Sequence, residues 1–147
     1  MIKKYAAAAL LLAAVPAVAG AAATQETATA VTSTTHTARL LLHVTAGHEF
    51  DQKHFAGTER VRSVATGKVV GFDTFSGHAL SDRVVFQTAF AFRGGILLTR
   101  VHTVGGAPAR YAGRVIGGTG AYRGATGTVS GRAVSREDTR FTIRYHL

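Results

Sequence analysis

Two carboxylates, Glu59 and Asp73, are the residues of this chain whose positions could support chemistry. Each lies inside an apolar stretch with the pattern of a β-strand, where a buried carboxylate is costly unless it has a partner. A carboxyl group in a cavity, paired with an arginine, can act as a general acid or base with a shifted pKa. Alternatively, each faces solvent and pairs with a neighbouring arginine for under about 1 kcal/mol. The sequence leaves both interpretations open, and Glu59 and Asp73 are the candidate catalytic residues.

Aromatic side chains could form the apolar wall of such a cavity. Three phenylalanines share one face of the alternating stretch 82–92 and are expected to point into the interior. Two tyrosines further along the chain each place a hydroxyl at the end of an apolar ring, a group that usually finds a hydrogen-bond partner when it is buried. The candidate cavity or ligand-binding residues are Phe86, Phe90, Phe92, Tyr111, Tyr122 and Arg123.

A dense polar segment lies between the first two apolar stretches. It contains three imidazoles and two carboxylates, which are ligand types that suit zinc or iron. Their spacing matches no helix face and no named metal motif, so a polar loop at the mouth of the fold is favoured. We therefore predict no metal site and no cofactor, and we treat this segment as a candidate lid. Its residues are His43, His48, Glu49, Asp51 and His54.

The elements that must position these groups are all strands, because no window shows a helical stripe with caps. About eight stretches, joined by short turns, read as strands. This rhythm predicts a sandwich or an up-and-down barrel. Eight strands can close around side chains or one small ligand, and closure removes exposed strand edges. The predicted strands are 38–44, 57–65, 69–75, 82–92, 96–104, 110–116, 126–134 and 140–147.

Residues 116–127, IGGTGAYRGATG, contain five glycines. A phosphate-binding loop would need a helix directly after the glycines. A strand follows instead, which favours a tight corner between two strands, where glycine tolerates positive φ and close backbone approach.

The N-terminus has the organisation of a secretory signal peptide. Lys3 and Lys4 precede an apolar run at 6–15, which is too short to span a bilayer, and Ala17-Val18-Ala19 offers small residues for cleavage. We expect a signal peptide at 1–19, a flexible Thr/Ala-rich leader at 20–36 and one domain at 37–147. Cleavage after residue 21 or 23 is the alternative. The protein is expected to be secreted, to the periplasm or the extracellular space, and to keep no stable membrane anchor.

The formal charge is +9, and the chain has no cysteine, so packing rather than disulfides must hold the fold. The arginines are spread over alternate strand positions. This pattern favours a solvated outer face over a nucleic-acid surface, and we expect no nucleic-acid partner. Binding of acidic polymers through the arginines stays open as a third hypothesis, and it predicts a steep dependence on salt.

Three short motifs carry a resemblance to a known group of proteins. They are GGTGAYRGA at 117–125, GKVVG at 67–71 and FRGGI at 92–96. In this order they resemble the allene oxide cyclase-like and dirigent-like β-barrels over about residues 38–147. The resemblance implies a calycin-type, eight-stranded antiparallel barrel with an apolar cavity, and homo-oligomers such as dimers or trimers. It also implies cofactor-independent chemistry in which the barrel folds or steers a reactive substrate and excludes water.

The chain departs from the dirigent pattern at Ala121, where members often carry an acid just after the Gly-Thr-Gly. The resemblance therefore supports the fold better than the activity. We hypothesise a secreted barrel that binds a small apolar molecule, as an isomerase or cyclase. The alternative is a non-enzymatic ligand carrier or surface interaction protein. A carboxylate buried beside an arginine or a tyrosine favours catalysis; two carboxylates on the outside favour the carrier.

Overall fold

A computed structural model describes residues 33–105 and 107–147. The expected signal peptide at 1–19 and all but the last four residues of the expected leader at 20–36 lie outside the described residues. In the part that is described, no helix is long and apolar enough to cross a membrane.

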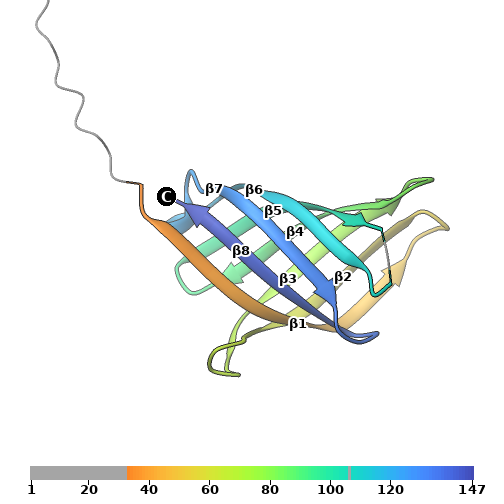
Figure 1. Ribbon diagram of the computed structural model, residues 1–147, viewed down its shortest axis with the longest axis horizontal. Helices are drawn as coiled ribbons and strands as arrows, with labels where there is room; N and C mark the ends of the chain where they lie inside the picture. Colours follow the sequence, from red (N-terminus) through yellow and green to blue (C-terminus); the bar gives the residue numbers. More distant parts are fainter. Residues whose placement is uncertain (1–32, 106) are drawn as a thin grey trace, which may run out of the picture. The chain divides into compact units, whose positions relative to one another are not determined.

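Eight strands make up most of the described chain (Figure 1). A single turn of 3-10 helix, η1 (Gly120–Tyr122), interrupts them between the sixth and seventh. The strands are β1 (Thr35–Glu49), β2 (His54–Ser63), β3 (Val69–Ala79), β4 (Val84–Phe92), β5 (Gly95–Val104), β6 (Arg110–Gly118), β7 (Thr126–Ala133) and β8 (Asp138–His146).

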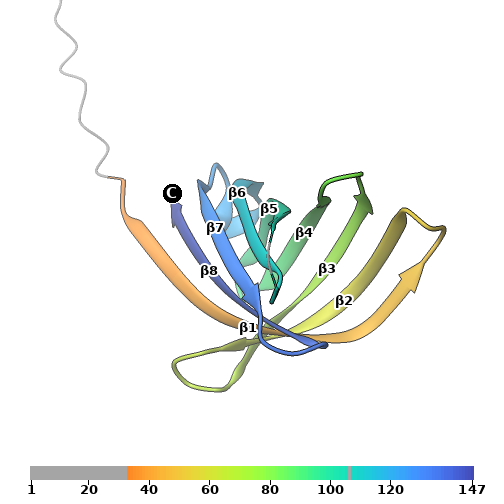
Figure 2. The same cartoon turned by 45° about the vertical axis from the view of Figure 1, so that its right-hand side comes forward.

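The strands close into a barrel in which each pairs antiparallel with the next and β8 pairs with β1. Figure 2 shows the strands curving around a common interior. This confirms the expected all-β class and the closed eight-stranded antiparallel barrel. Short connections bring each strand back beside its predecessor, and the pairing of β8 with β1 removes the two edges of the sheet.

The largest departure from the predicted strands is at the β1–β2 hairpin. The prediction ended the first strand at residue 44, but β1 runs to Glu49, and its register with β2 shifts between Val44 and Ala46. Most of the polar segment that we expected to be a loop is therefore paired backbone. A bulge absorbs the irregularity, and ladder hydrogen bonds form whatever the polarity of the side chains.

The glycine-rich segment forms the corner between β6 and β7, as predicted. Gly120 has φ 57°, in the region where a side chain is strained, and η1 packs back against the β4–β5 turn through the bond from Ala121 N–H to the Gly94 carbonyl. The barrel thus has two ends. One carries this corner and both chain termini of the barrel; the other carries the β1–β2, β3–β4, β5–β6 and β7–β8 turns.

Alternate residues of every strand point inward and form one core. The fully buried apolar members come from β1, β2 and β4 to β8, together with Ala125, and β3 contributes no apolar member. The core residues are Leu40, Leu42, Val61, Phe90, Leu97, Val101, Val115, Ala125, Val129, Phe141 and Ile143.

Candidate functional site

Glu59 on β2 and Asp73 on β3 both point into the barrel. They are direct partners in the antiparallel register of the two strands, which places their β-carbons about 5 Å apart. Only 8% of Glu59 and 1% of Asp73 is exposed. The sequence left open whether these carboxyls face inside or outside, and the register places both inside.

The surroundings of this pair favour the protonated state. Burial raises the pKa of Glu59 to about 7, partly offset by the nearby Asp73 and His43. Burial, followed by the charge of Glu59, raises the pKa of Asp73 to about 9. No described residue makes a hydrogen bond to either oxygen of the Asp73 carboxylate within ordinary geometry. Two close carboxyls in an apolar interior cannot both ionise at neutral pH, so the pair retains one proton there.

Glu59 opens onto a cavity of about 260 Å³ inside the barrel, at the end that carries the β1–β2 and β7–β8 turns. We call it the carboxylate cavity. Its wall is mainly aromatic and aliphatic, with two threonines and the Arg136–Glu137 turn near the mouth. The lining residues are Leu42, Val44, Phe55, Glu59, Phe75, Val84, Phe86, Thr103, Tyr111, Arg136, Glu137, Thr139 and Phe141. Asp73, the direct partner of Glu59 on β3, is not among them.

Tyr111 is the second polar group that the barrel places in this cavity. Its ring packs edge-on against Phe86 and Phe141, each with a centroid separation of 5.8 Å. Burial raises the pKa of the Tyr111 hydroxyl; the neighbouring Thr139 side chain partly offsets this rise, and the charge of Glu59 adds a little to it. The hydroxyl therefore stays protonated and can donate a hydrogen bond to a ligand near Glu59.

The other candidate cavity residues divide among three places. Phe86 lines the carboxylate cavity, whereas Phe90 is fully buried in the core. Phe92 and Tyr122 lie at the opposite end of the barrel, with a ring separation of 5.9 Å, and line a separate hollow there. Arg123 is exposed in the turn after η1 and lines neither hollow. The chain reverses direction at η1, which turns Arg123 away from the interior.

Two expectations about the site need correction. The partner of each carboxylate is the other carboxylate, because no arginine forms an ion pair with Glu59 or Asp73 in the described residues. The sequence reasoning also missed Phe55, Phe75 and Phe141 as cavity residues. Phe141 could have been found, since it opens the alternating apolar face of the last strand. Phe75 lies two residues after Asp73 on the same strand. It must therefore share the inward face once Asp73 is known to point inward.

The polar residues of the first hairpin are distributed along β1, β2 and the turn between them. In residues 33–105 and 107–147, no three His, Asp or Glu side chains come together in a metal-binding group. His43 instead contacts Asp138 of β8 through Nδ1 and Oδ1 at 2.9 Å, and Asp51 contacts His54 at 2.7 Å. The first pair joins β1 to β8, and the second lies at the turn between β1 and β2.

Solved structures share this fold. A pyocyanin demethylase aligns with TM-score 0.62 and 18% identity, over 75% of this chain and 99% of its own. A pterocarpan synthase dirigent protein aligns with TM-score 0.64 and 17% identity, over 78% and 88%. A nonspecific heme-binding cyclase that catalyses a [4 + 2] cycloaddition in neoabyssomicin biosynthesis aligns with TM-score 0.60 and 17% identity, over 76% and 64%.

No family model and no curated protein matches the sequence. The dirigent protein and the cyclase confirm the resemblance stated from the motifs, at the level of the barrel fold. Function must be argued from the site, since one barrel can host many activities.

Proposed function

We propose that this protein binds a small apolar molecule in the carboxylate cavity, and that Glu59 acts on it as a general acid or base without a cofactor. The reaction class is an isomerisation or cyclisation of a substrate that is already reactive. The observation that carries the proposal is the buried Glu59–Asp73 pair, of which Glu59 alone opens onto an apolar cavity. The similar barrels include a pyocyanin demethylase and a heme-binding cyclase, both named for small molecules.

The arrangement assigns different roles to the two carboxyls. Because the pKa of Glu59 is near 7, it can accept or donate a proton at neutral pH, which is the optimum for a general acid or base. Asp73 lies beside Glu59 on the neighbouring strand and is a positioning residue whose retained proton limits the charge inside the barrel. The Tyr111 hydroxyl can orient a substrate oxygen, and the aromatic wall excludes water from the reaction.

The cavity volume restricts the substrate. At about 260 Å³ it is slightly below the usual range for pockets that hold drug-sized ligands. The ligand is therefore compact and largely apolar, with one acidic C–H or one basic oxygen directed at Glu59. The buried carboxylate next to a tyrosine favours catalysis over the carrier alternative.

Export and self-association belong to the same proposal. The basic start, short apolar run and small residues of 1–19 support secretion. Homo-oligomerisation is supported by exposed apolar side chains on the outer faces of β3, β5 and β6, namely Phe72, Ile96 and Ile116. Phe72 and Ile96 flank Ala91 of β4 in the strand register, and contiguous exposed apolar surface of this kind marks contact sites.

Binding to the cavity can be tested with 2-naphthol, a fluorescent aromatic alcohol, as the probe. Wild-type protein should bind it and shift its emission. Val84→Phe fills the mouth of the cavity and should abolish the shift, whereas Val85→Phe adds the same volume to the outer face of β4 and should not change it. Equal binding by both variants would show that the probe sits elsewhere and would remove the cavity from the proposal.

Proton transfer can be tested with a nitrobenzisoxazole. A base removes its ring C–H proton, the N–O bond breaks, and a coloured cyanophenolate forms. The rate with wild-type protein should rise with pH through about 7, following Glu59, and Glu59→Gln should lower it by roughly 10²–10⁴-fold while 2-naphthol still binds. Binding without any rate dependent on Glu59 would favour the non-enzymatic carrier.

A further inference from the structure

The outer face of β5 to β8 carries six arginines in register. Arg110 on β6, Arg132 on β7 and Arg140 on β8 are direct neighbours across the strands. We call these three residues the arginine ladder. Four residues further along β6, Arg114 faces Arg100 on β5. Arg144 on β8 lies across Thr128 from Arg114. All six side chains are exposed. Strands β6 to β8 lie side by side on the near side of Figure 1.

This face has almost no compensating negative charge. Strands β5, β6 and β7 contain no acidic residue, and the only one on β8, Asp138, is paired with His43. Within the described chain, no ion pair includes an arginine. Like charges directly opposite each other on neighbouring strands are destabilising, so the fold gains nothing from this arrangement.

The ladder also borders a hollow of about 330 Å³. Its wall consists of the three ladder arginines together with Ser130, Gly131 and Thr142. The guanidinium groups offer several donors in a planar fork suited to carboxylate and sulfate oxygens. The hydroxyls between them can hydrogen-bond to neutral oxygens of the same ligand. Neighbouring strands are about 4.8 Å apart, so the ladder presents a row of closely spaced cationic sites.

We propose that the outer face of β5 to β8 binds a linear acidic polysaccharide across the strands. Such a polymer carries carboxylates or sulfates at intervals and hydroxyls between them, which matches the alternation of arginine with serine and threonine. The outer positions of β6 to β8 carry no phenylalanine, tyrosine or tryptophan (they are Arg110, Ala112, Arg114, Ile116, Thr126, Thr128, Ser130, Arg132, Arg140, Thr142, Arg144 and His146). A single-stranded nucleic acid would need such rings for base stacking. This site is separate from the carboxylate cavity and does not depend on the proposed catalysis.

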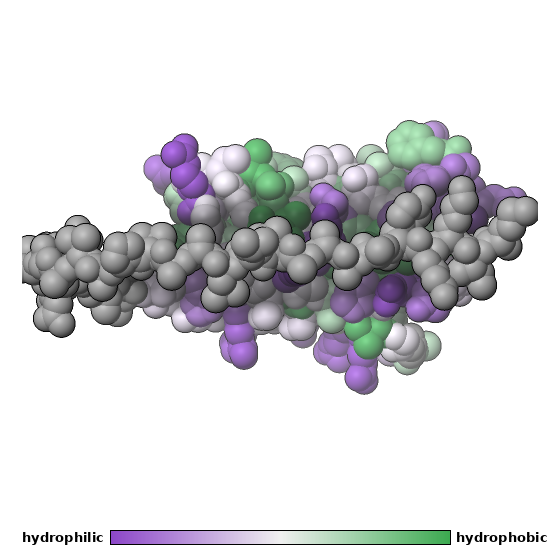
Figure 3. All heavy atoms as spheres, turned by 90° about the horizontal axis from the view of Figure 1, so that it is seen from above, coloured by the Kyte–Doolittle hydropathy of each residue, from purple (hydrophilic) through white to green (hydrophobic). Residues whose placement is uncertain are grey.

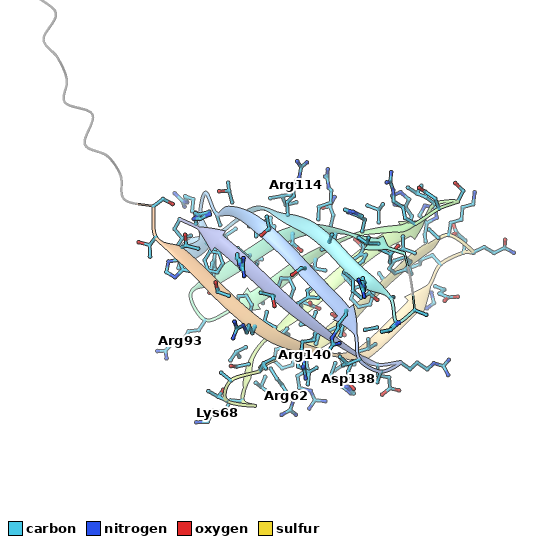
Figure 4. The ribbon with its side chains drawn as sticks, in the orientation of Figure 1. Arg62, Lys68, Arg93, Arg114, Asp138 and Arg140 are labelled. Carbon is cyan, nitrogen blue, oxygen red and sulfur yellow. The ribbon has the colours of Figure 1, made fainter. Side chains whose placement is uncertain are left out.

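The test compares two variants of equal charge. In the first, all three ladder residues become glutamine: Arg110→Gln, Arg132→Gln and Arg140→Gln. In the second, three exposed arginines in turns are replaced: Arg83→Gln, Arg93→Gln and Arg123→Gln. Figure 4 shows Arg93 projecting at the opposite side of the barrel from Arg114. Heparin, polygalacturonate and a single-stranded DNA of matched charge serve as probes, with Kd measured from low to physiological salt.

We expect wild-type protein and the turn variant to bind at least one of the two polysaccharides more tightly than the DNA. The ladder variant should bind at least tenfold more weakly, and the slope of log Kd against log salt should fall by about one for each arginine removed. Unchanged 2-naphthol binding and circular dichroism would show that its barrel is intact. Equal losses of polysaccharide affinity in both variants would show that only net charge matters. This result would overturn the proposal. DNA binding as tight as polysaccharide binding, and lost with the ladder, would assign the face to nucleic acid instead.

Discussion

Glu59 and Asp73 are the only ionisable side chains that are buried in the described part of the chain. Their shared location explains why both pKa values are raised, since each loses hydration and each would repel the other's charge. Such a pair costs stability when it ionises, and proteins keep costly buried charges mainly where they have a function. The stability cost and the proposed proton transfer therefore both come from burying the two carboxyls together.

This cost predicts a pH dependence of stability. Both folded-state pKa values exceed the ordinary values, so the folded state binds more protons than the unfolded chain, and stability falls as pH rises. Between about pH 7 and 9, Asp73 keeps its proton only when folded, and wild-type protein should lose about 1.4 kcal/mol per pH unit. Asp73→Asn should flatten this slope and be more stable than wild type at pH 8.5 in urea unfolding. Exposed Asp82→Asn should keep the wild-type slope; a wild-type slope in Asp73→Asn would contradict the buried pair.

The strands determine which side chains meet in the cavity, and inward-facing glycines make room for the rings. A β-carbon added to Gly131 on β7 would collide with the Phe141 ring on the neighbouring β8, and one added to Gly57 on β2 would collide with the Phe75 ring on β3. Each glycine therefore lets a phenylalanine lie flat against the strand beside it. The aromatic wall of the carboxylate cavity depends on these pairs.

Gly131→Ala tests this packing. The added methyl group must displace a buried ring, so unfolding free energy should fall by about 1–3 kcal/mol, and 2-naphthol binding should weaken because Phe141 lines the cavity. Gly47→Ala is the matched control, since a β-carbon there meets nothing within 4 Å. Adding Phe141→Leu to Gly131→Ala should restore part of the lost stability in denaturant unfolding. Equal stability of the two single variants would show that the ring has free space to move.

The whole barrel separates two chemical environments, a low-charge interior with two carboxyls and an arginine-rich exterior. Hydrophilic and hydrophobic residues are interspersed on the face shown in Figure 3, and no single type covers it. A high positive charge of this kind favours solubility and attraction to anionic partners. The arginine-rich exterior is the feature that the proposed binding of an acidic polysaccharide requires.

Export can be tested on the full chain. When the protein is expressed with its own N-terminus in a bacterium with Sec export, the mature form should begin at Gly20, after removal of residues 1–19. Intact-mass measurement of the periplasmic or medium fraction checks this. Ala19→Arg should block processing, and Ala23→Arg should leave it unchanged. A mature form that begins elsewhere, or a cytoplasmic full-length form, would contradict the expected site.

The sequence alone was sufficient to predict the all-β class of the fold and to identify its two candidate carboxylates. Period-two alternation is a local property, so strands such as β4 could be placed within about two residues of their ends. The glycine corner at 117–127 was identified for the same reason, because backbone strain is decided by a few adjacent residues. The sequence could also single out Glu59 and Asp73, since a charge within an apolar strand is visible without a structure.

Only the tertiary structure decided which face of each strand points inward and what lies across from it. A shift of one residue in register would have moved every side chain to the other face. The turn between β2 and β3 fixes the register of that hairpin, which paired Glu59 with Asp73 rather than with an arginine. The curvature of the closed barrel then brought Phe55, Phe75 and Phe141 around one cavity. The registers of the β6–β7 and β7–β8 pairs likewise aligned Arg110, Arg132 and Arg140, which are far apart in sequence, into one row.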